Sequence, residues 1–448
     1  MKDHSCKFEK FAGDTFVYFP QHFVKRYSEF SSISFDKILD IYKIVKKVKK
    51  ISLLHILLLV FGFNFLNSCS PSGAKTDPHA RPRVDSVRSA QFFKQIDGPA
   101  KAHRCDSVFH WKVAKQRFNG AVLVGQYGQV IYKNTSGYAD FENGHAINNH
   151  TSFQLASVSK QFTAVAVLML YEKKMLSLDD DVKKFYPEFP YNGITIRLLL
   201  SHRSGMPNYL NFAYAYWKNK SELMSNQELM DMMILHHPTR AALPDTHFEY
   251  CNTNYAILAA IVEKVSGLTF AAFMQRNVFE PLDMKDAFVY SPAALAKHPN
   301  TAIGYTPHAR RGNFEFTDGV AGDKGLYCSI EDMWKWDCAM YNYQLISRET
   351  TELAYTPYSH EKRGMKNYGF GWRMIVYSPQ QKAVYHNGWW HQFNNAYFRG
   401  LNDRTTIIVL GNTSNFSNYQ IQPFLDALSG AKRGGAGVDA QDEEDLDK

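Results

Sequence analysis

The sequence predicts an α/β domain of the α+β kind, with one antiparallel sheet from both chain ends, flanking helices and a mainly helical second region. Segments with strand-like alternation occur early, at about 121–134, and again late, between 368 and 410. The region between them, roughly 175–300, has the apolar spacing of helices joined by long loops. Early and late strands around a helical middle are expected to meet in one sheet.

The elements are expected in a definite order. A helix of about 105–117 opens the globular part, and two strands follow around the turn at Tyr127-Gly128. Apolar residues recur at helical spacing after Ser157. The Met-rich stretch 224–234 is expected to be a helix with its Met side chains in the core, in preference to a flexible lid. The late elements are strands at 368–374, 383–386, 395–398 and 405–410, then a helix at 417–429.

Composition and charge exclude a nucleic-acid-binding class. The chain has 448 residues, 45% of them hydrophobic, which is enough for a large core. Its formal net charge is +8, but residues 1–68 hold 11 Lys and Arg residues against six Asp and Glu residues. The remainder therefore carries only +3. No basic stripe interleaved with aromatic residues follows, so no nucleic-acid partner is expected.

Residues 46–68 have the features of a bacterial lipoprotein signal peptide. Four lysines precede an apolar run from Ile51 to Leu66, and Leu66-Asn67-Ser68-Cys69 resembles a lipobox. Cys69 is then expected to carry a lipid that anchors the protein in the cell envelope, in the periplasm or at the outer membrane. A transmembrane anchor is the alternative, but about 16 apolar residues is short for a span that needs roughly 20. Residues 1–45 are expected to be an upstream extension from a misassigned start.

Polar segments are expected on both sides of the domain, which is assigned to 105–430. Residues 69–104 are rich in Pro and Ser near their start and are expected to form a tether. Residues 431–448 are Gly-rich and then acidic, as in disordered tails. The remaining cysteines suit no zinc motif, so no metal is expected, and their pairing as disulfides is left open; they are Cys105, Cys251, Cys328 and Cys338.

Ser157-Val158-Ser159-Lys160 is the candidate catalytic segment. On a helix, Ser157 and Lys160 lie on one face, which places a hydroxyl beside an amine that can help deprotonate it. The spacing alone is weak, because four other Ser/Lys pairs share it in segments without an apolar helix: Ser34/Lys37, Ser72/Lys75, Ser359/Lys362 and Ser429/Lys432. Other segments of the chain must therefore show whether Ser157 and Lys160 are the catalytic pair.

Two further segments provide the other groups that acyl transfer needs. These are a second proton-transfer group, a polar side chain for the substrate and an oxyanion hole. Tyr250 and Asn252 lie two residues apart just before an apolar helix. His386 and Gly388 lie at the end of an expected strand, where a glycine lets a substrate approach the strand edge closely.

In this order the three segments resemble the motifs of the serine β-lactamase and penicillin-binding protein superfamily. The closest resemblance is to its class C-like branch of serine hydrolases, with Ser-x-x-Lys, Tyr-x-Asn and Lys/His-x-Gly. It covers about residues 105–428 and includes segments outside the motifs, such as Leu199-Leu-Ser-His-Arg-Ser-Gly-Met-Pro. The resemblance implies a β-lactamase/transpeptidase-like fold and an acyl-serine intermediate, without metal or nucleotide cofactor.

The resemblance also assigns the catalytic residues. Ser157 would be the nucleophile, Lys160 its activating neighbour, and Tyr250 would carry the proton between nucleophile and leaving group. Either Lys160 or Tyr250 could be the base for acylation.

The substrate-binding residues follow in the same way. Asn252 would hydrogen-bond the substrate and the lysine. The backbone N–H groups of Ser157 and Trp389 would form the oxyanion hole beside Gly388. His386 would make a polar or cationic contact to the substrate, where true class C β-lactamases carry Lys.

The resemblance implies an amide or ester substrate, most readily a cell-wall-type D-amino-acid peptide or a small ester. A β-lactam is less favoured, because an imidazole is mostly neutral at pH 7 and anchors a carboxylate poorly. A non-catalytic receptor for cell-wall fragments is the alternative from another class, although a receptor need not keep both Lys160 and Tyr250.

Other polar residues are expected to have structural roles. His202, His236 and His237 lack metal-ligand spacing and are assigned to packing or to the surface. Ser204-Gly205 is expected to form a turn near the site. Lys324 is expected to be solvated.

Overall fold

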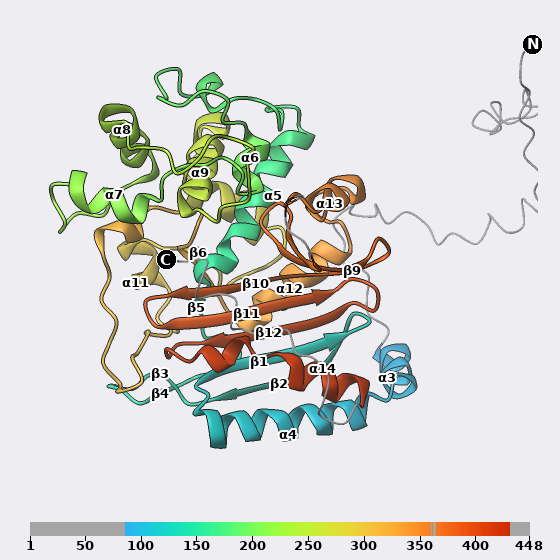
Figure 1. Cartoon of the computed structure of the whole chain (residues 1–448). Helices are drawn as coiled ribbons and strands as arrows, with labels where there is room; N and C mark the ends of the chain where they lie inside the picture. The colour runs from blue at the N-terminus through green and yellow to red at the C-terminus, as the bar shows by residue number, and fades with distance from the viewer. Residues whose placement is uncertain (1–85, 360, 362–363, 431–448) are drawn as a thin grey trace, which may run out of the picture. The chain divides into compact units, whose positions relative to one another are not determined.

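A computed structural model describes residues 86–359, 361 and 364–430 (Figure 1). These residues belong to one compact unit, which begins at Val84. The predicted extension, the signal peptide with Cys69, and the acidic tail lie outside the described residues. So do residues 69–85 of the predicted tether.

A seven-stranded antiparallel sheet combines strands from early and late parts of the chain. Its order is β2-β1-β12-β11-β10-β9-β8, so that the early β1 pairs with the late β12, with Gly120 opposite Gly411. This confirms the predicted sheet. The strands are β1 Gly120–Gln126, β2 Gln129–Ser136, β8 Lys366–Tyr368, β9 Arg373–Ser378, β10 Gln381–Trp390, β11 Phe393–Gly400 and β12 Thr405–Gly411.

The sheet is apolar on both faces, because helices cover each of them (Figure 1). Along β1, Ala121 and Leu123 pack into the core that contains α5, α9 and α12, whereas Val122 and Val124 pack under α4 and α14. This alternation is the two-residue period of a strand. A strand that is buried on both faces has a continuous apolar sequence, and Ala121-Val-Leu-Val is such a sequence.

Helices joined by long loops form the second region, and helices form both covering layers. Residues 224–234 fall largely in α8, which begins at a capping box of Ser225 and Glu228 and buries Met230 and Met233, so the predicted helix is confirmed. The helices are α3 Ser86–Gln95, α4 Gly98–Gln116, α5 Ser159–Glu172, α6 Ile196–Leu200, α7 Tyr209–Tyr216, α8 Asn226–His236, α9 Asn252–Ser266, α10 Phe270–Met274, α11 Pro292–Lys297, α12 Ile330–Tyr341, α13 Arg348–Ala354 and α14 Gln422–Ser429.

Short elements complete the fold. Two small sheets contain β3 Tyr138–Asp140 with β4 His145–Ala146, and β5 Phe153–Gln154 with β7 Leu326–Cys328 and β6 Phe288–Val289. The single-turn segments are η2 Ala156–Val158, η3 Val182–Lys184, η4 Gln275–Phe279, η5 Phe316–Gly319 and η6 Phe416–Tyr419. Within the described residues no single helix has the length and apolarity of a membrane span. α9 and the helical segment Phe270–Phe279 reach that length and apolarity only when they are taken together, and the two are bent by 75° relative to each other.

Three predicted boundaries are corrected. Residues 86–104, assigned to the tether, hold α3 and the first turns of α4, which starts at Gly98 with Pro99 in its first turn. The strand predicted at 368–374 is interrupted by a turn at 369–372 between β8 and β9, since Gly371 has φ +79° and the Gly369 N–H donates to the Trp372 carbonyl oxygen. The last helix begins at Gln422, after η6.

Candidate active site

Ser157 lies in a tight turn that connects β5 to α5. The preceding Ala156 is fully buried and has φ +50°, which is unusual for a residue with a Cβ. Such a backbone persists only where the surrounding contacts fix it, and it often occurs at functional sites. Ser157 is half-buried in η2, and Lys160 follows in the first turn of α5.

Lys160 is a fully buried amine surrounded by oxygen atoms. Its Nζ lies 2.9 Å from Ser157 Oγ, 2.8 Å from Asn252 Oδ1 and 3.0 Å from the backbone oxygen of Asp323. Three acceptors match the three donors of an ammonium group, and a buried charge requires such partners. Lys160 therefore joins Ser157 to the start of α9 and to the segment before β7.

The Tyr250 hydroxyl lies 2.9 Å from Ser157 Oγ, so that the serine contacts both Lys160 and Tyr250. Two cations flank the tyrosine ring: Lys160 Nζ is 4.8 Å from the ring centroid and the Arg373 guanidinium carbon is 5.1 Å from it. Nearby positive charge favours a phenolate over a phenol. This arrangement can accept the serine proton and return it to a leaving group.

His202 holds the segment that carries Tyr250. Its backbone oxygen accepts the Glu249 N–H at 2.8 Å, and its Nδ1 accepts the Cys251 N–H at 3.1 Å. The imidazole centroid is 4.4 Å from that of the Tyr250 ring. Burial lowers the pKa of His202 well below its usual range, and the Lys160 charge acts in the same direction, so the ring is neutral.

Gly388 brings β10 against Ser157. A Cβ at this position would lie 2.3 Å from the Leu155 backbone oxygen and 3.2 Å from the Ser157 amide nitrogen. Only glycine allows such a close approach. Trp389, whose N–H is assigned to the oxyanion hole, comes next in β10 with a half-exposed side chain.

His386 is fully buried behind the site. Its Nδ1 lies 2.7 Å from the Asn387 carbonyl oxygen, and its Nε2 is 3.2 Å from the Tyr368 hydroxyl. Burial lowers the pKa of His386 well below its usual range, and the charges of Arg373 and Lys160 lower it further. The cationic form that the sequence allowed is therefore wrong at neutral pH, because a charged ring would have to lose its hydration beside two cations.

Two residues near the site were missed or misassigned from the sequence. Arg373 starts β9 and reaches the Tyr250 ring from a neighbouring strand, a proximity that no local pattern reveals. Lys324 is 3% exposed instead of solvated: its Nζ bonds the Tyr209 hydroxyl and the Thr317 carbonyl oxygen. Among the described residues, no group of three or more His, Cys, Asp or Glu could hold a metal ion.

A polar cluster follows the part of β10 that packs against Ser157. Asp318 accepts hydrogen bonds from the Trp390 indole at 2.7 Å and from His391 Nε2 at 2.8 Å. Burial alone would raise the pKa of Asp318, but the His391 hydrogen bond and the His391 and Lys324 charges lower it. Trp390 is thus fixed at the strand end, while Trp389 stays open to solvent.

Comparison with known proteins identifies the family of this chain. The family model described as Beta-lactamase matches residues 100–429. The chain belongs to the beta-lactamase family. The superfamily that the motifs resemble is thereby confirmed, and with it a serine hydrolase of this family.

Relatives of this beta-lactamase family member include penicillin-binding proteins. It is 31% identical over 337 residues to penicillin-binding protein 4* of Bacillus subtilis, covering 71% of this chain and 74% of that protein. It is 28% identical over 220 residues to a D-aminopeptidase of Brucella anthropi, covering 49% of this chain and 41% of that enzyme. The structure of an octameric penicillin-binding protein homologue from Pyrococcus abyssi matches with a TM-score of 0.63 and 26% identity, over 72% of this chain and 76% of that one.

Proposed function

We propose that this chain hydrolyses peptides that end in a D-amino acid, by a covalent acyl-Ser157 intermediate. The observation that carries the proposal is the contact of Ser157 Oγ with both Lys160 Nζ and the Tyr250 hydroxyl at 2.9 Å. A serine nucleophile needs an adjacent group that takes its proton, and this site offers two.

The proposed reaction has two halves. Ser157 Oγ attacks the scissile carbonyl carbon as its proton passes to the Tyr250 oxygen, which the charges of Lys160 and Arg373 stabilise as a phenolate. The N–H groups of Ser157 and Trp389 stabilise the oxyanion. The C–N bond then breaks, and the leaving amine takes the proton from Tyr250. In the second half, a water molecule hydrolyses the acyl-serine ester and releases the acid.

Arg373 favours a substrate with a free carboxylate on the leaving-group side. Its guanidinium lies over the Tyr250 ring, close to the group that protonates the leaving amine. Arg binds carboxylates in bidentate geometry, and His386 is neutral, so Arg373 is the cation suited to a terminal carboxylate. The D-aminopeptidase among the relatives supports a D-amino-acid substrate.

A substrate panel tests the proposal. We expect turnover of N-acetyl-Lys-D-Ala-D-Ala, at least about tenfold slower turnover of its C-terminal amide, and none of the L-Ala-L-Ala peptide. Ser157→Ala abolishes turnover and labelling by fluorescent penicillin, whereas the surface control Ser177→Ala leaves both unchanged. Rapid hydrolysis of short-chain esters or nitrocefin without peptide turnover would assign the site to an esterase or β-lactamase. Peptide binding without turnover or labelling would identify a receptor.

We also propose that the chain is exported and lipid-anchored through Cys69, on the signal-like residues 46–68. Expression of the full chain with radiolabelled palmitate tests this. The wild-type protein should carry the label and partition into detergent, and Cys69→Ser should do neither. An unlabelled wild-type protein would contradict the proposal.

A further inference from the structure

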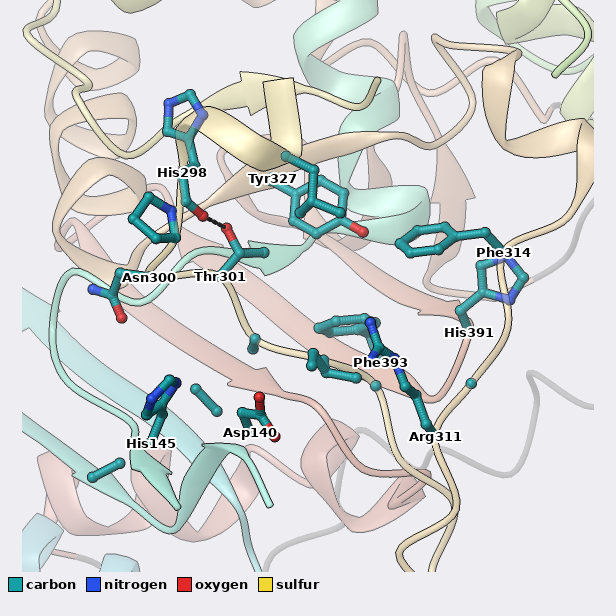
Figure 2. A pocket seen from close by; sticks show the side chains of 18 of the residues that line it. Asp140, His145, His298, Asn300, Thr301, Arg311, Phe314, Tyr327, His391 and Phe393 are labelled. Carbon is teal, nitrogen blue, oxygen red and sulfur yellow. Dashed lines mark hydrogen bonds between the residues drawn. The ribbon is translucent and has the colours of Figure 1, made fainter. Parts of the chain in front are cut away.

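A cavity of about 650 Å³ lies beyond the end of β10 that follows the catalytic glycine (Figure 2). Its size is typical of a small-molecule or peptide-side-chain site. Neither Ser157, Lys160 nor Tyr250 lines it. The lining comes from segments far apart in sequence: residues 139–148, the segment from Leu295 to Gly304, the segment from Arg311 to Phe314, Tyr327, and His391 with Phe393.

One side of this cavity is aromatic. Tyr327 and Phe393 are almost fully buried, with ring centroids 6.2 Å apart. The ring of Phe288 lies parallel to both Tyr327 and His298, at 4.8 Å and 4.2 Å. Phe314 is 43% exposed at the rim (Figure 2). Phe288 lies outside the lining, and the aromatic side chains that do line the cavity, Tyr327, Phe393 and Phe314, provide apolar area for the body of a ligand.

The cavity lining contains one arginine, Arg311, and one aspartate, Asp140. Arg311 is exposed at its rim, and its guanidinium makes no hydrogen bond or ion pair with any residue that the structure describes. Asp140 is the acidic residue of the lining, but its carboxylate already accepts from the backbone of Glu142 and Asn143, the Asn143 side chain and the Tyr305 hydroxyl. An anionic group therefore fits beside Arg311.

The cavity is joined to the catalytic strand through the β10–β11 turn. His391 lies three residues after Gly388, which is roughly 10 Å along a strand. The loop that lines the cavity packs directly on this turn, since a Cβ on Gly304 would lie 1.9 Å from the His391 backbone oxygen. Asp318 fixes the turn through His391 and the strand end through Trp390.

We propose that this cavity is the subsite for the acyl side of the peptide substrate, and that Arg311 binds a carboxylate there. The inference rests on the proposed function. In the register of β9 and β10, Arg373 lies opposite Tyr385, which precedes Gly388 along β10. The cavity lies beyond the other end of β10, at His391. A peptide laid along β10 would thus have its terminal carboxylate near Arg373 and an acidic side chain, three residues before the scissile bond, near Arg311.

Matched peptides test the subsite. The probes are acetyl-Glu-Gly-D-Ala-D-Ala and the same peptide with Gln in place of Glu. We expect the wild-type protein to hydrolyse the Glu peptide with a kcat/KM about tenfold higher. Arg311→Gln should remove this preference and leave the Gln peptide unchanged. The adjacent, exposed Arg310→Gln carries the same charge change outside the cavity and should keep the preference.

Two results would overturn the inference: equal kcat/KM for both peptides in the wild-type protein, or equal loss of preference in both variants. Labelling by fluorescent penicillin reports on the catalytic site separately, and Arg311→Gln should label at the wild-type rate. If no peptide is hydrolysed, the proposed function fails, and calorimetric titration with acetyl-Glu-Gly-amide tests the cavity alone. Binding lost in Arg311→Gln but kept in Arg310→Gln supports the carboxylate site, and no binding contradicts it.

Discussion

His202 Nδ1 accepts a hydrogen bond from the Cys251 N–H at 3.1 Å, and this bond fixes the residue next to Tyr250. The His202 backbone oxygen binds the residue on the other side, Glu249. One buried histidine thus holds Tyr250 from both flanks, with its ring against the phenol. We interpret His202 as a positioning residue that keeps the Tyr250 hydroxyl 2.9 Å from Ser157 Oγ.

Replacing His202 tests this interpretation. His202→Phe keeps a ring but removes the acceptor, and we expect acylation by fluorescent penicillin to slow by about 10- to 100-fold, because small displacements of reacting groups are costly. His202→Asn retains an acceptor near the Nδ1 position and tolerates the φ of +55°, so it should recover most of the rate. The pH profile of acylation should change in the Phe variant only. Equal rates in variants of equal thermal stability would contradict the role.

Gly388→Ala should disable acylation. The new methyl group would lie 2.3 Å from the Leu155 backbone oxygen, so β10 must move away from Ser157. Displacing an oxyanion-hole donor costs about 100-fold or more in rate. Acylation rates measured by stopped-flow, with circular dichroism as a check of folding, test this. In the control Gly400→Ala, the methyl group first meets atoms at 3.3 Å, and acylation should be nearly unchanged.

The sequence predicted the parts of this protein that depend on local pattern. Apolar runs located β1 and β12, and three short motifs named residues that the structure brings together around Ser157. It could not reveal Arg373, because its approach to Tyr250 depends on the turn between β8 and β9. The burial of Lys324 was also hidden, since a lysine in a Gly-rich segment has the local pattern of a solvated loop.

The burial of His386 illustrates the same limit. A His-x-Gly motif at a strand end indicates a substrate contact, but the Tyr368 ring beside the imidazole comes from another strand. The charge state of His386 depends on that packing and on Arg373. Its role is therefore a tertiary property that spacing does not contain.

Acid should weaken the protein through Glu361. Burial alone would raise the pKa of Glu361, but hydrogen bonds from Arg203 and from the Phe248 N–H lower it from 4.5 to about 2. A lowered pKa stabilises the folded state above pH 4.5, and this stabilisation is lost as the pH falls toward 2. Because the Glu361 side chain is about one third exposed, we expect its ionised form to contribute only about 1 kcal/mol to the free energy of unfolding. Urea unfolding should show that the free energy of unfolding of Glu361→Gln falls less between pH 6 and pH 3 than that of the wild-type protein. An equal fall in both proteins would contradict the assignment.

The buried pair of Arg399 and Asp337 should matter far more to stability than a surface pair. Arg399 Nε lies 2.8 Å from Asp337 Oδ1, both side chains are 1% exposed, and Tyr397 and Thr406 also donate to this carboxylate. Asp337→Ala would leave the guanidinium buried without its counter-ion, which costs about 3–5 kcal/mol. The control is Asp179→Ala, which removes the partner of Arg197 but affects a carboxylate that is 70% exposed, and it should cost less than about 1 kcal/mol. Urea unfolding at pH 7 measures both, and similar losses in the two variants would show that the pair does not stabilise the sheet in this way.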